Sequence, residues 1–251
     1  RADLLTFAQA GKRWRPWALP VLLLAAAALA LAVDFPLARW CVDKECPGEL
    51  RRLCGIGEPF GNGYGVMAIA LAIYILDPLR RRKLARVLAM SFVAGMAANW
   101  LKLLVARVRP HRFDFPGAVQ DTFVGWLPLG AGGSARQSFP SAHTATAVAL
   151  AIGLAWLYPR GRWLFATLAV LVACQRMTSG AHYLSDTLVG MAVGCVIAMP
   201  FLHNAWLAAQ FDRLESRALG HRQWASDSLR SAPITRVTFE AEAEKDRSRA
   251  A

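Results

Sequence analysis

Residues 140–143, Pro-Ser-Ala-His, combine a helix start with a side chain that can carry a proton. They open a long apolar run. Proline tolerates the first turn of a helix, and the oxygen of Ser141 can accept a hydrogen bond from a free backbone amide. Helix N-termini attract anions, so His143 could deliver a proton to a bound anion. Taken alone, the segment is equally typical of a plain N-cap with an interfacial histidine.

A second histidine, His182, precedes Asp186 by four residues, and Arg176 lies six residues upstream. Residues four apart share one face of a helix, so the carboxylate could hold the imidazole. An aspartate at a helix start is often only a cap. We expect the helix to begin near His182, which would put Asp186 too late to serve as one.

The third group is Lys102 and Arg109, which is followed by Pro110. Seven residues is close to two helical turns, so both cations would point the same way if the helix held as far as Arg109. Cations at the ends of membrane spans also commonly reach for lipid headgroups, and that interpretation stays open for this pair.

Together these groups fit a phosphate monoester or diphosphate. Lys102, Arg109 and Arg176 could neutralise the non-bridging oxygens, while Ser141 and helix-terminal amides donate hydrogen bonds. One imidazole could attack phosphorus and the other protonate the leaving oxygen. No Asp/Asn cluster indicates a metal, so we expect neither metal nor cofactor.

The composition predicts a membrane protein. Of the 251 residues, 55% are hydrophobic, yet the formal net charge is +12. Multi-span membrane proteins combine these properties because cations collect in their cytoplasmic loops. Nucleic-acid binding fits poorly, because Lys and Arg flank apolar runs instead of lining one polar face.

We expect an all-α fold, a polytopic membrane protein with about six transmembrane helices in a bundle. The first span should be retained, because no small-residue cleavage motif follows it directly. The second is short for a bilayer, which requires roughly 20 residues. The expected spans are Trp17–Val33, Gly63–Leu76, Val87–Val105, Ser141–Leu157, Trp163–Met177 and Tyr183–Leu202.

Basic residues set the expected orientation. With six spans, the N-terminus, the cluster at 80–86, Arg160 with Arg162, and the C-terminal tail share one side. The positive-inside rule makes that side, with both termini, cytoplasmic. The active site would then lie at the outer membrane face, facing the periplasm of a bacterial inner (plasma) membrane.

The expected domains are a six-span membrane domain over 1–205, which carries the motif residues 102–186, and a cytoplasmic tail over 206–251. The tail is amphipathic from Trp206 to Leu219, and its composition after Ser226 is typical of disorder.

Three features of the outer segments have open interpretations. One disulfide among Cys41, Cys46 and Cys54 is possible on the oxidising side. Residues 111–135 could be a lid that selects the headgroup, with Phe113, Phe115, Phe123 and Trp126 in the interface, or a mobile loop with an aromatic belt. Three arginines in the first outer segment could bind a second phosphate, or they could simply keep that loop solvated. They are Arg39, Arg51 and Arg52.

The patterns K-x6-RP, PSxH and R-x5-H-x3-D occur in this order over residues 102–186. They resemble the three-part signature of the type 2 phosphatidic acid phosphatase superfamily, and the expected spans resemble its membrane branch. Nine fixed positions at set spacings make a chance match improbable. Two residues depart from the family pattern: Ala142 replaces the usual glycine, and Gln175 replaces the usual serine before the arginine.

The resemblance implies roles for the catalytic residues. His182 would be the nucleophile that forms a phosphohistidine, Asp186 would orient it, and His143 would be the general acid that later activates water. The phosphoryl group would be held by Lys102, Arg109, Ser141, the Ala142 N–H and Arg176.

The implied function is a metal-independent lipid phosphatase. Its candidate substrates are undecaprenyl diphosphate, phosphatidylglycerol phosphate, phosphatidic acid and the phosphates of lipid A. A phosphotransferase with the same phosphoenzyme and a non-catalytic lipid-phosphate binding or transport protein remain alternatives. The sequence does not indicate the oligomeric state.

Overall fold

The computed structural model describes residues 17–115, 117–129 and 131–215. The chain divides into two compact units, Arg1–Phe211 and Asp212–Ala251. The site described below lies wholly in the first unit. The expected disordered segment after Ser226 lies outside the described residues.

The first unit is mostly helical. Its long helices are Trp17–Ala30, α5 (Gly63–Leu76), α6 (Leu84–Leu101), α7 (Ala142–Leu157), α8 (Arg162–Thr178) and α9 (Leu184–His203). Its shorter helices are α2 (Asp34–Val42), α3 (Gly48–Gly55) and α4 (Glu58–Gly61). Residues 205–211 of this unit are also helical and overlap the expected amphipathic segment. Single 3-10 turns are η1 (Arg81–Lys83), η2 (Pro110–Arg112), η3 (Val119–Thr122), η4 (Gly133–Arg136) and η5 (Pro159–Gly161).

Each of the six expected spans contains a helix, but not each helix is long enough to cross a membrane by itself. Among the described residues, two helices are sufficiently long and apolar, Arg81–Leu101 and Leu184–His203. A third crossing would need Trp17–Ala30 and Asp34–Val42 to act as one broken span, bent by 76°. The number of six spans therefore remains a prediction.

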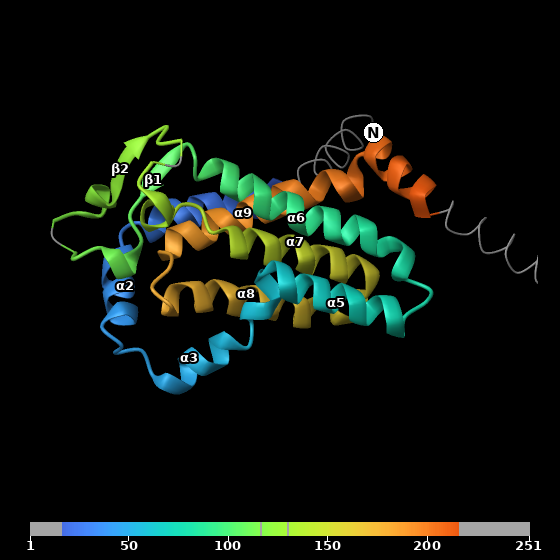
Figure 1. Ribbon diagram of the computed structural model, residues 1–251, viewed down its shortest axis with the longest axis horizontal. Coiled ribbons are helices and arrows are strands. Elements are labelled where there is room, and N and C mark those ends of the chain that lie inside the picture. Colours follow the sequence, from blue (N-terminus) through green and yellow to red (C-terminus); the bar gives the residue numbers. More distant parts are fainter. Residues whose placement is uncertain (1–16, 116, 130, 216–251) are drawn as a thin grey trace, which may run out of the picture. The chain divides into compact units, whose positions relative to one another are not determined.

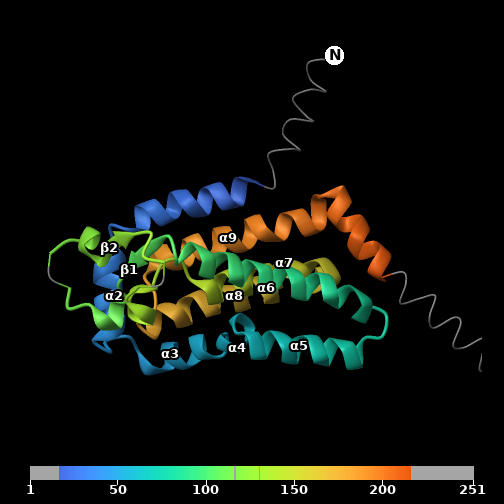
Figure 2. The same ribbon diagram turned by 45° about the horizontal axis from the view of Figure 1, so that its top comes forward.

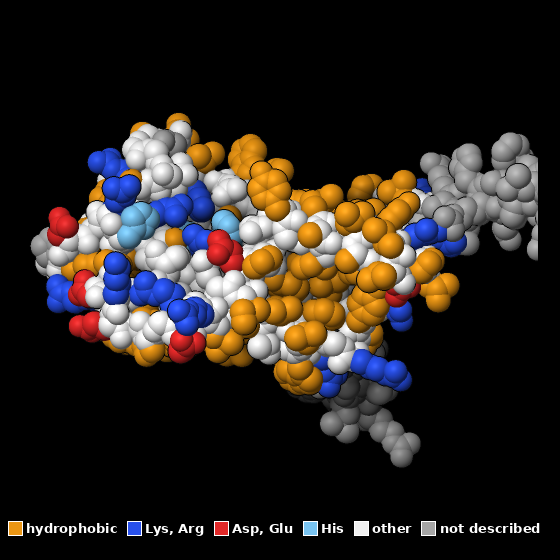
Figure 3. All heavy atoms as spheres, turned by 60° about the horizontal axis from the view of Figure 1, so that its bottom comes forward, with side chains coloured by type: hydrophobic (Ala, Val, Ile, Leu, Met, Phe, Trp, Pro, Cys, Tyr) orange, Lys and Arg blue, Asp and Glu red, His pale blue; other side chains and the backbone are white. Residues whose placement is uncertain are grey.

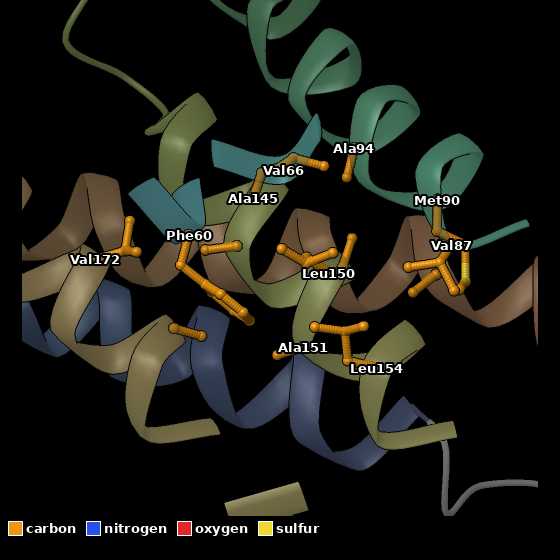
Figure 4. Close-up of a cluster of buried hydrophobic side chains, with 14 of the residues drawn as sticks. Phe60, Val66, Val87, Met90, Ala94, Ala145, Leu150, Ala151, Leu154 and Val172 are labelled. Carbon is orange, nitrogen blue, oxygen red and sulfur yellow. The ribbon is translucent and has the colours of Figure 1, made fainter. Parts of the chain in front are cut away.

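Helix α7 is the centre of the bundle, because α6, α8 and α9 all pack against it. Ser141 caps its start by accepting a hydrogen bond from the backbone N–H of Thr144, at 3.4 Å. Figure 4 shows the core around it, in which Leu150 and Leu154 are almost completely buried. Apolar contacts on several faces are what a helix in the middle of a bundle requires.

Small residues allow α9 to lie close to α7. A methyl group added at Gly194 would meet the carbonyl oxygen of Ala145 at 2.6 Å, and one at Gly190 would meet that of Ser141 at 2.5 Å. Such close approach is typical of helices packed within membranes. It also brings the start of α9 against the start of α7.

One end of the bundle collects the predicted site segments. Helix α6 ends there, and α7 and α9 begin there, beside α2 and a two-stranded hairpin (left in Figures 1 and 2). The hairpin pairs β1 (Val105–Arg107) antiparallel with β2 (Phe123–Trp126). The basic turn η1 joins α5 to α6 at the other end.

Some local features were not predicted from the sequence. Residues 34–62 contain α2, α3 and α4, and a hairpin interrupts the otherwise helical fold of the described residues. Helix α6 ends at Leu101, so no continuous helix joins Lys102 to Arg109. The possible disulfide among Cys41, Cys46 and Cys54 is not formed, since all three are free, buried thiols.

The aromatic residues of the 111–135 segment behave differently from one another. Phe113 and Phe115 pack against Phe35, with ring centroids 5.6 and 5.4 Å away. Phe123 packs against Phe139 at 6.2 Å, whereas the Trp126 side chain is 79% exposed. Only Trp126 therefore remains a candidate for the interface, and the role of the segment as a lid remains a prediction.

Candidate active site

His182 lies in the short connection between α8 and α9 and is almost completely buried. Its Nδ1 forms a hydrogen bond with the backbone carbonyl of Ser138, at 2.5 Å. A carbonyl only accepts, so Nδ1 carries the proton and Nε2 has the free lone pair. Burial lowers the pKa of His182 to about 4, with Asp186 opposing and Lys102 and Arg109 adding to the effect. The imidazole is thus neutral at pH 7, as a nucleophile must be.

Asp186 lies near His182 but makes its hydrogen bonds elsewhere. The distance from His182 Nδ1 to Asp186 Oδ2 is 3.8 Å, too long for a hydrogen bond. Asp186 Oδ2 instead accepts from the hydroxyl of Ser138 at 2.6 Å and from the backbone N–H of Tyr183 at 2.9 Å.

Two expectations therefore need correction. The helix begins at Leu184, two residues after His182, and Asp186 does cap its first turn by accepting from the Tyr183 N–H. Its effect on the imidazole comes through its charge and through Ser138, which contacts both side chains.

Arg107 is a fully buried cation that the sequence analysis missed. Its guanidinium donates to both Asp186 and Asp34, the latter at 2.7 Å, and to the hydroxyl of Ser185 at 2.8 Å. The guanidinium also lies over the ring of Tyr183, 4.0 Å from the centroid. Its backbone carbonyl accepts from the N–H of Ser138, at 3.0 Å. Arg107 therefore holds both the carboxylate and the segment that fixes His182.

Asp34 completes this buried network from the far N-terminal side of the chain. It begins α2, directly after the bend, and its side chain is completely buried. Its Oδ1 accepts from the backbone N–H of Ser185 at 3.0 Å, and its Oδ2 accepts from the Ser185 hydroxyl. Buried charges are tolerated only when paired and hydrogen-bonded, and this network satisfies both conditions.

The three predicted phosphate-binding cations converge near His182 in spite of the interrupted helix. Lys102 is 8% exposed. Burial lowers its pKa to about 8, and the charges of Arg109 and Arg176 act in the same direction. The guanidinium of Arg109 donates to the Ser134 carbonyl at 2.8 Å, which orients the side chain. Cations held this closely repel one another unless an anion lies between them.

Arg176 supplies a free donor. Its Nη1 donates to the side chain of Gln175 at 3.3 Å, whereas its Nε is buried and has no hydrogen-bond partner among the described residues. Buried donors are rarely left unpaired, so this one indicates an acceptor that the protein itself does not provide.

The PSxH segment lies beside these cations. The Ser141 oxygen accepts a hydrogen bond from the Thr144 hydroxyl at 2.9 Å, so its own proton remains available to donate. His143 is half-buried and interacts electrostatically with Arg176, His182 and Lys102. The second histidine therefore lies near the first, as the sequence predicted.

The charges of the site favour an anion. Four cations, Lys102, Arg107, Arg109 and Arg176, are near the two buried carboxylates Asp34 and Asp186, and Glu58 also acts on Arg176. With both histidines neutral, the site keeps an excess of positive charge, which suits a phosphate group. The surface of this end shows Lys, Arg and His side chains together, next to a flank that is largely apolar (Figure 3).

Comparison with known proteins identifies the family. Residues 83–209, half of the chain, match the PAP2 superfamily. The chain belongs to the PAP2 superfamily. This confirms the family predicted from the three motifs.

Two relatives are named as phosphatases. The chain is 29% identical to a lipid A 1-phosphatase of Rhizobium etli, over 60% of this chain and 69% of the relative. It is 33% identical to a decaprenylphosphoryl-5-phosphoribose phosphatase of Mycobacterium tuberculosis, over 60% and 77% respectively. A crystal structure of a transmembrane PAP2 type phosphatidylglycerolphosphate phosphatase from Bacillus subtilis aligns over 75% of this chain and 94% of that one, with 18% identity and a TM-score of 0.49. The family match and the two named phosphatases identify an enzyme of the phosphatase class, and the long apolar helices indicate a membrane protein.

The family match begins at residue 83 and so omits Asp34. Sequence reasoning also passed over Arg107 and Ser138, although both lie within the motif region. A signal was present for Arg107, because a charged residue between Ala106 and Val108 is unexpected unless it is paired. No sequence signal connected Asp34 with Ser185, 151 residues away.

Proposed function

We propose that this PAP2 protein is a metal-independent phosphatase of lipid phosphates or diphosphates that acts through a phosphohistidine. The observation that carries the proposal is the unpartnered Nε of Arg176 beside a neutral, oriented His182. It is an anion site with a nucleophile at its edge. The named substrates of both relatives are phosphorylated lipids, which supports a lipid substrate here.

In the first step, Nε2 of His182 attacks phosphorus and forms the P–N bond while the bond to the leaving oxygen breaks. Binding of the anionic phosphate favours the protonated form of His143. Protonated His143 gives its proton to that oxygen, so the lipid alcohol or lipid phosphate leaves neutralised and His143 becomes neutral. The proton on His182 Nδ1 stays on that nitrogen and is donated to the Ser138 carbonyl, and Asp186 stabilises the positive charge that the ring acquires.

In the second step, His143 takes a proton from water, the water oxygen attacks phosphorus, and the P–N bond breaks. Inorganic phosphate leaves and His182 is regenerated. Throughout, Lys102, Arg109, Arg176 and the Ser141 hydroxyl hold the non-bridging oxygens. Phosphoryl transfer depends chiefly on such alignment and charge stabilisation.

We propose further that the site faces the periplasm and that both termini are cytoplasmic. The basic turn η1 at the opposite end of the bundle supports this orientation. Exposed Lys44 and exposed Arg160 are suitable positions for single cysteines. A membrane-impermeant maleimide added to intact spheroplasts should label Lys44→Cys and spare Arg160→Cys, and the reverse pattern would invert the topology.

The test of the activity is phosphate release by the detergent-purified protein, with EDTA present. The substrate panel is undecaprenyl diphosphate, phosphatidylglycerol phosphate, phosphatidic acid and lipid A. We expect release from at least one lipid, complete loss in His182→Ala, and no loss in His203→Ala, whose side chain is exposed at the far end of α9. Release that persists in His182→Ala, or that EDTA abolishes, would refute the mechanism.

A further inference from the structure

A cavity of about 340 Å³ lies next to the phosphate site and plays no part in the mechanism above. Its polar and charged lining comes from the loop after α2, from α3, from η2 and from the end of α8. These residues are Lys44, Arg51, His111, Gln175, Thr178 and Ser179.

The Gln175 side chain lies between the cavity and the phosphate site. It lines the cavity, and its side-chain oxygen accepts from the Arg176 guanidinium at 3.3 Å. Its side-chain nitrogen donates to Glu58 at 3.2 Å, which holds the amide in this orientation. A ligand in the cavity would therefore lie one side chain away from the phosphoryl group on Arg176.

His111 and Gly180 connect the cavity to the other parts of the site. The ring and the backbone N–H of His111 both bond to the Gly180 carbonyl, at 2.8 and 3.1 Å. His111 comes two residues after Arg109, and Gly180 comes two residues before His182. The cavity is thus bounded by the same chain segments that carry the catalytic residues.

The cavity is cationic. None of its described lining residues is acidic, while Lys44 and Arg51 bring positive charge. Arg51 is half-buried, and its guanidinium donates to the carbonyl of Cys41 at 3.1 Å, which leaves its charge without a counter-charge in that bond. Its neighbour Arg52 differs, because Arg52 forms an exposed ion pair with Glu49 at 2.8 Å.

We infer that this cavity binds a second phosphoryl group of the lipid headgroup, separate from the one that is hydrolysed. The inference rests on the proposed phosphatase activity. It gives Gln175, which departs from the family pattern, a position between two anion sites. The sequence left open whether Arg51 and Arg52 bind a second phosphate or are only solvated. Under this inference Arg51 binds substrate, and Arg52 is a solvated surface charge.

The test compares two lipids with the same acyl chains, phosphatidylglycerol phosphate and phosphatidic acid. Only the first has a second phosphate in its headgroup. We expect Arg51→Gln to raise KM about tenfold for phosphatidylglycerol phosphate and less than about twofold for phosphatidic acid, with kcat unchanged for both, since loss of a charge-assisted hydrogen bond weakens binding by about this factor. Lys44→Gln should act in the same direction more weakly, because Lys44 is exposed.

Arg52→Gln is the matched control and should leave both lipids unaffected. Equal effects of Arg51→Gln on the two lipids, or an effect of Arg52→Gln as large as that of Arg51→Gln, would overturn the inference. Thermal unfolding in detergent checks the fold of each variant. If Arg51→Gln does not fold, the comparison of the two lipids is made with Lys44→Gln, because the exposed Lys44 side chain does not support the packing.

Two further arms separate the possible failures. The first is a titration that measures binding of both lipids without turnover. It tests the cavity even if the wild-type protein hydrolyses neither lipid. Lack of hydrolysis by itself would refute the proposed function but not the cavity assignment. Inorganic phosphate should inhibit the wild type and Arg51→Gln equally with phosphatidic acid as substrate. Weaker inhibition of Arg51→Gln would mean that the cavity binds free phosphate, and the headgroup assignment would fall.

Discussion

The buried network of Arg107 with Asp34 and Asp186 leads to a prediction about paired substitutions. Arg107→Met leaves two buried carboxylates without their cation, whereas Asp34→Asn leaves the cation with one carboxylate. In the double variant only Asp186 is charged, which restores the net charge of the wild-type network. We therefore expect the double variant to lose less stability than the sum of the losses in the two single variants.

The magnitude follows from the geometry. The Arg107 and Asp34 side chains meet at 2.7 Å, and both are completely buried. Unit charges about 4 Å apart interact by roughly 4 kcal/mol at an effective dielectric constant of 20. Breaking a buried pair from one side typically costs about 3–5 kcal/mol. We expect each single variant to lose about that much, and a coupling of about 3 kcal/mol between the two substitutions.

The assay is unfolding by SDS titration in mixed detergent micelles, followed by tryptophan fluorescence, for the wild type and the three variants. The surface pair Arg52 and Glu49 supplies the control cycle, with expected coupling below about 1 kcal/mol. If the loss of stability in the double variant equals the sum of the two single losses to within about 0.5 kcal/mol, Arg107 and Asp34 are not coupled and the reasoning is refuted.

Activity should depend on pH with two limits: kcat/KM rises as pH increases through about 4, where neutral His182 forms, and falls above about 8, where Lys102 loses its proton. Lys102→Arg should remove the alkaline fall in a pH–rate profile, and a fall that persists would assign that limit to another group. Ser138→Ala deletes a hydrogen bond to the catalytic carboxylate but keeps the backbone carbonyl, so steady-state kinetics should show kcat reduced about tenfold with KM unchanged. Gly194→Ala should reduce the free energy of unfolding by about 1–3 kcal/mol through overpacking against α7, whereas Gly48→Ala, with open space around it, should not.

The sequence predicted the apolar helices well because their composition leaves few alternatives. Both ends of α5 agree with the expected span, and those of α8 differ by one residue. The motifs likewise predicted that Lys102, His143 and Arg176 would meet at one end of the bundle. Each lies where an apolar run meets a polar segment, and such junctions of adjacent spans share a membrane face.

What the sequence did not predict depends on contacts between distant segments. The end of α6 and the hairpin after it follow from pairing of Arg107 with Phe123 and with the segment before Ser138, not from local propensity. The hydrogen-bond partner of His182 is a backbone carbonyl, and any residue type could have provided it. Spacing alone favoured Asp186, whose charge is close but whose hydrogen bonds go elsewhere.

The position of Asp34 at the bend also bears on the biogenesis of the enzyme. Asp34 is synthesised long before its partners Arg107 and Ser185, yet its carboxylate has no exposed surface in the folded protein. An unpaired carboxylate is costly in an apolar environment, so Asp34 must remain hydrated until both partners have emerged. Asp186, the other carboxylate of the network, is itself part of the start of α9. A nascent chain that ends before residue 185 therefore lacks both Ser185 and Asp186, and the buried network cannot yet form.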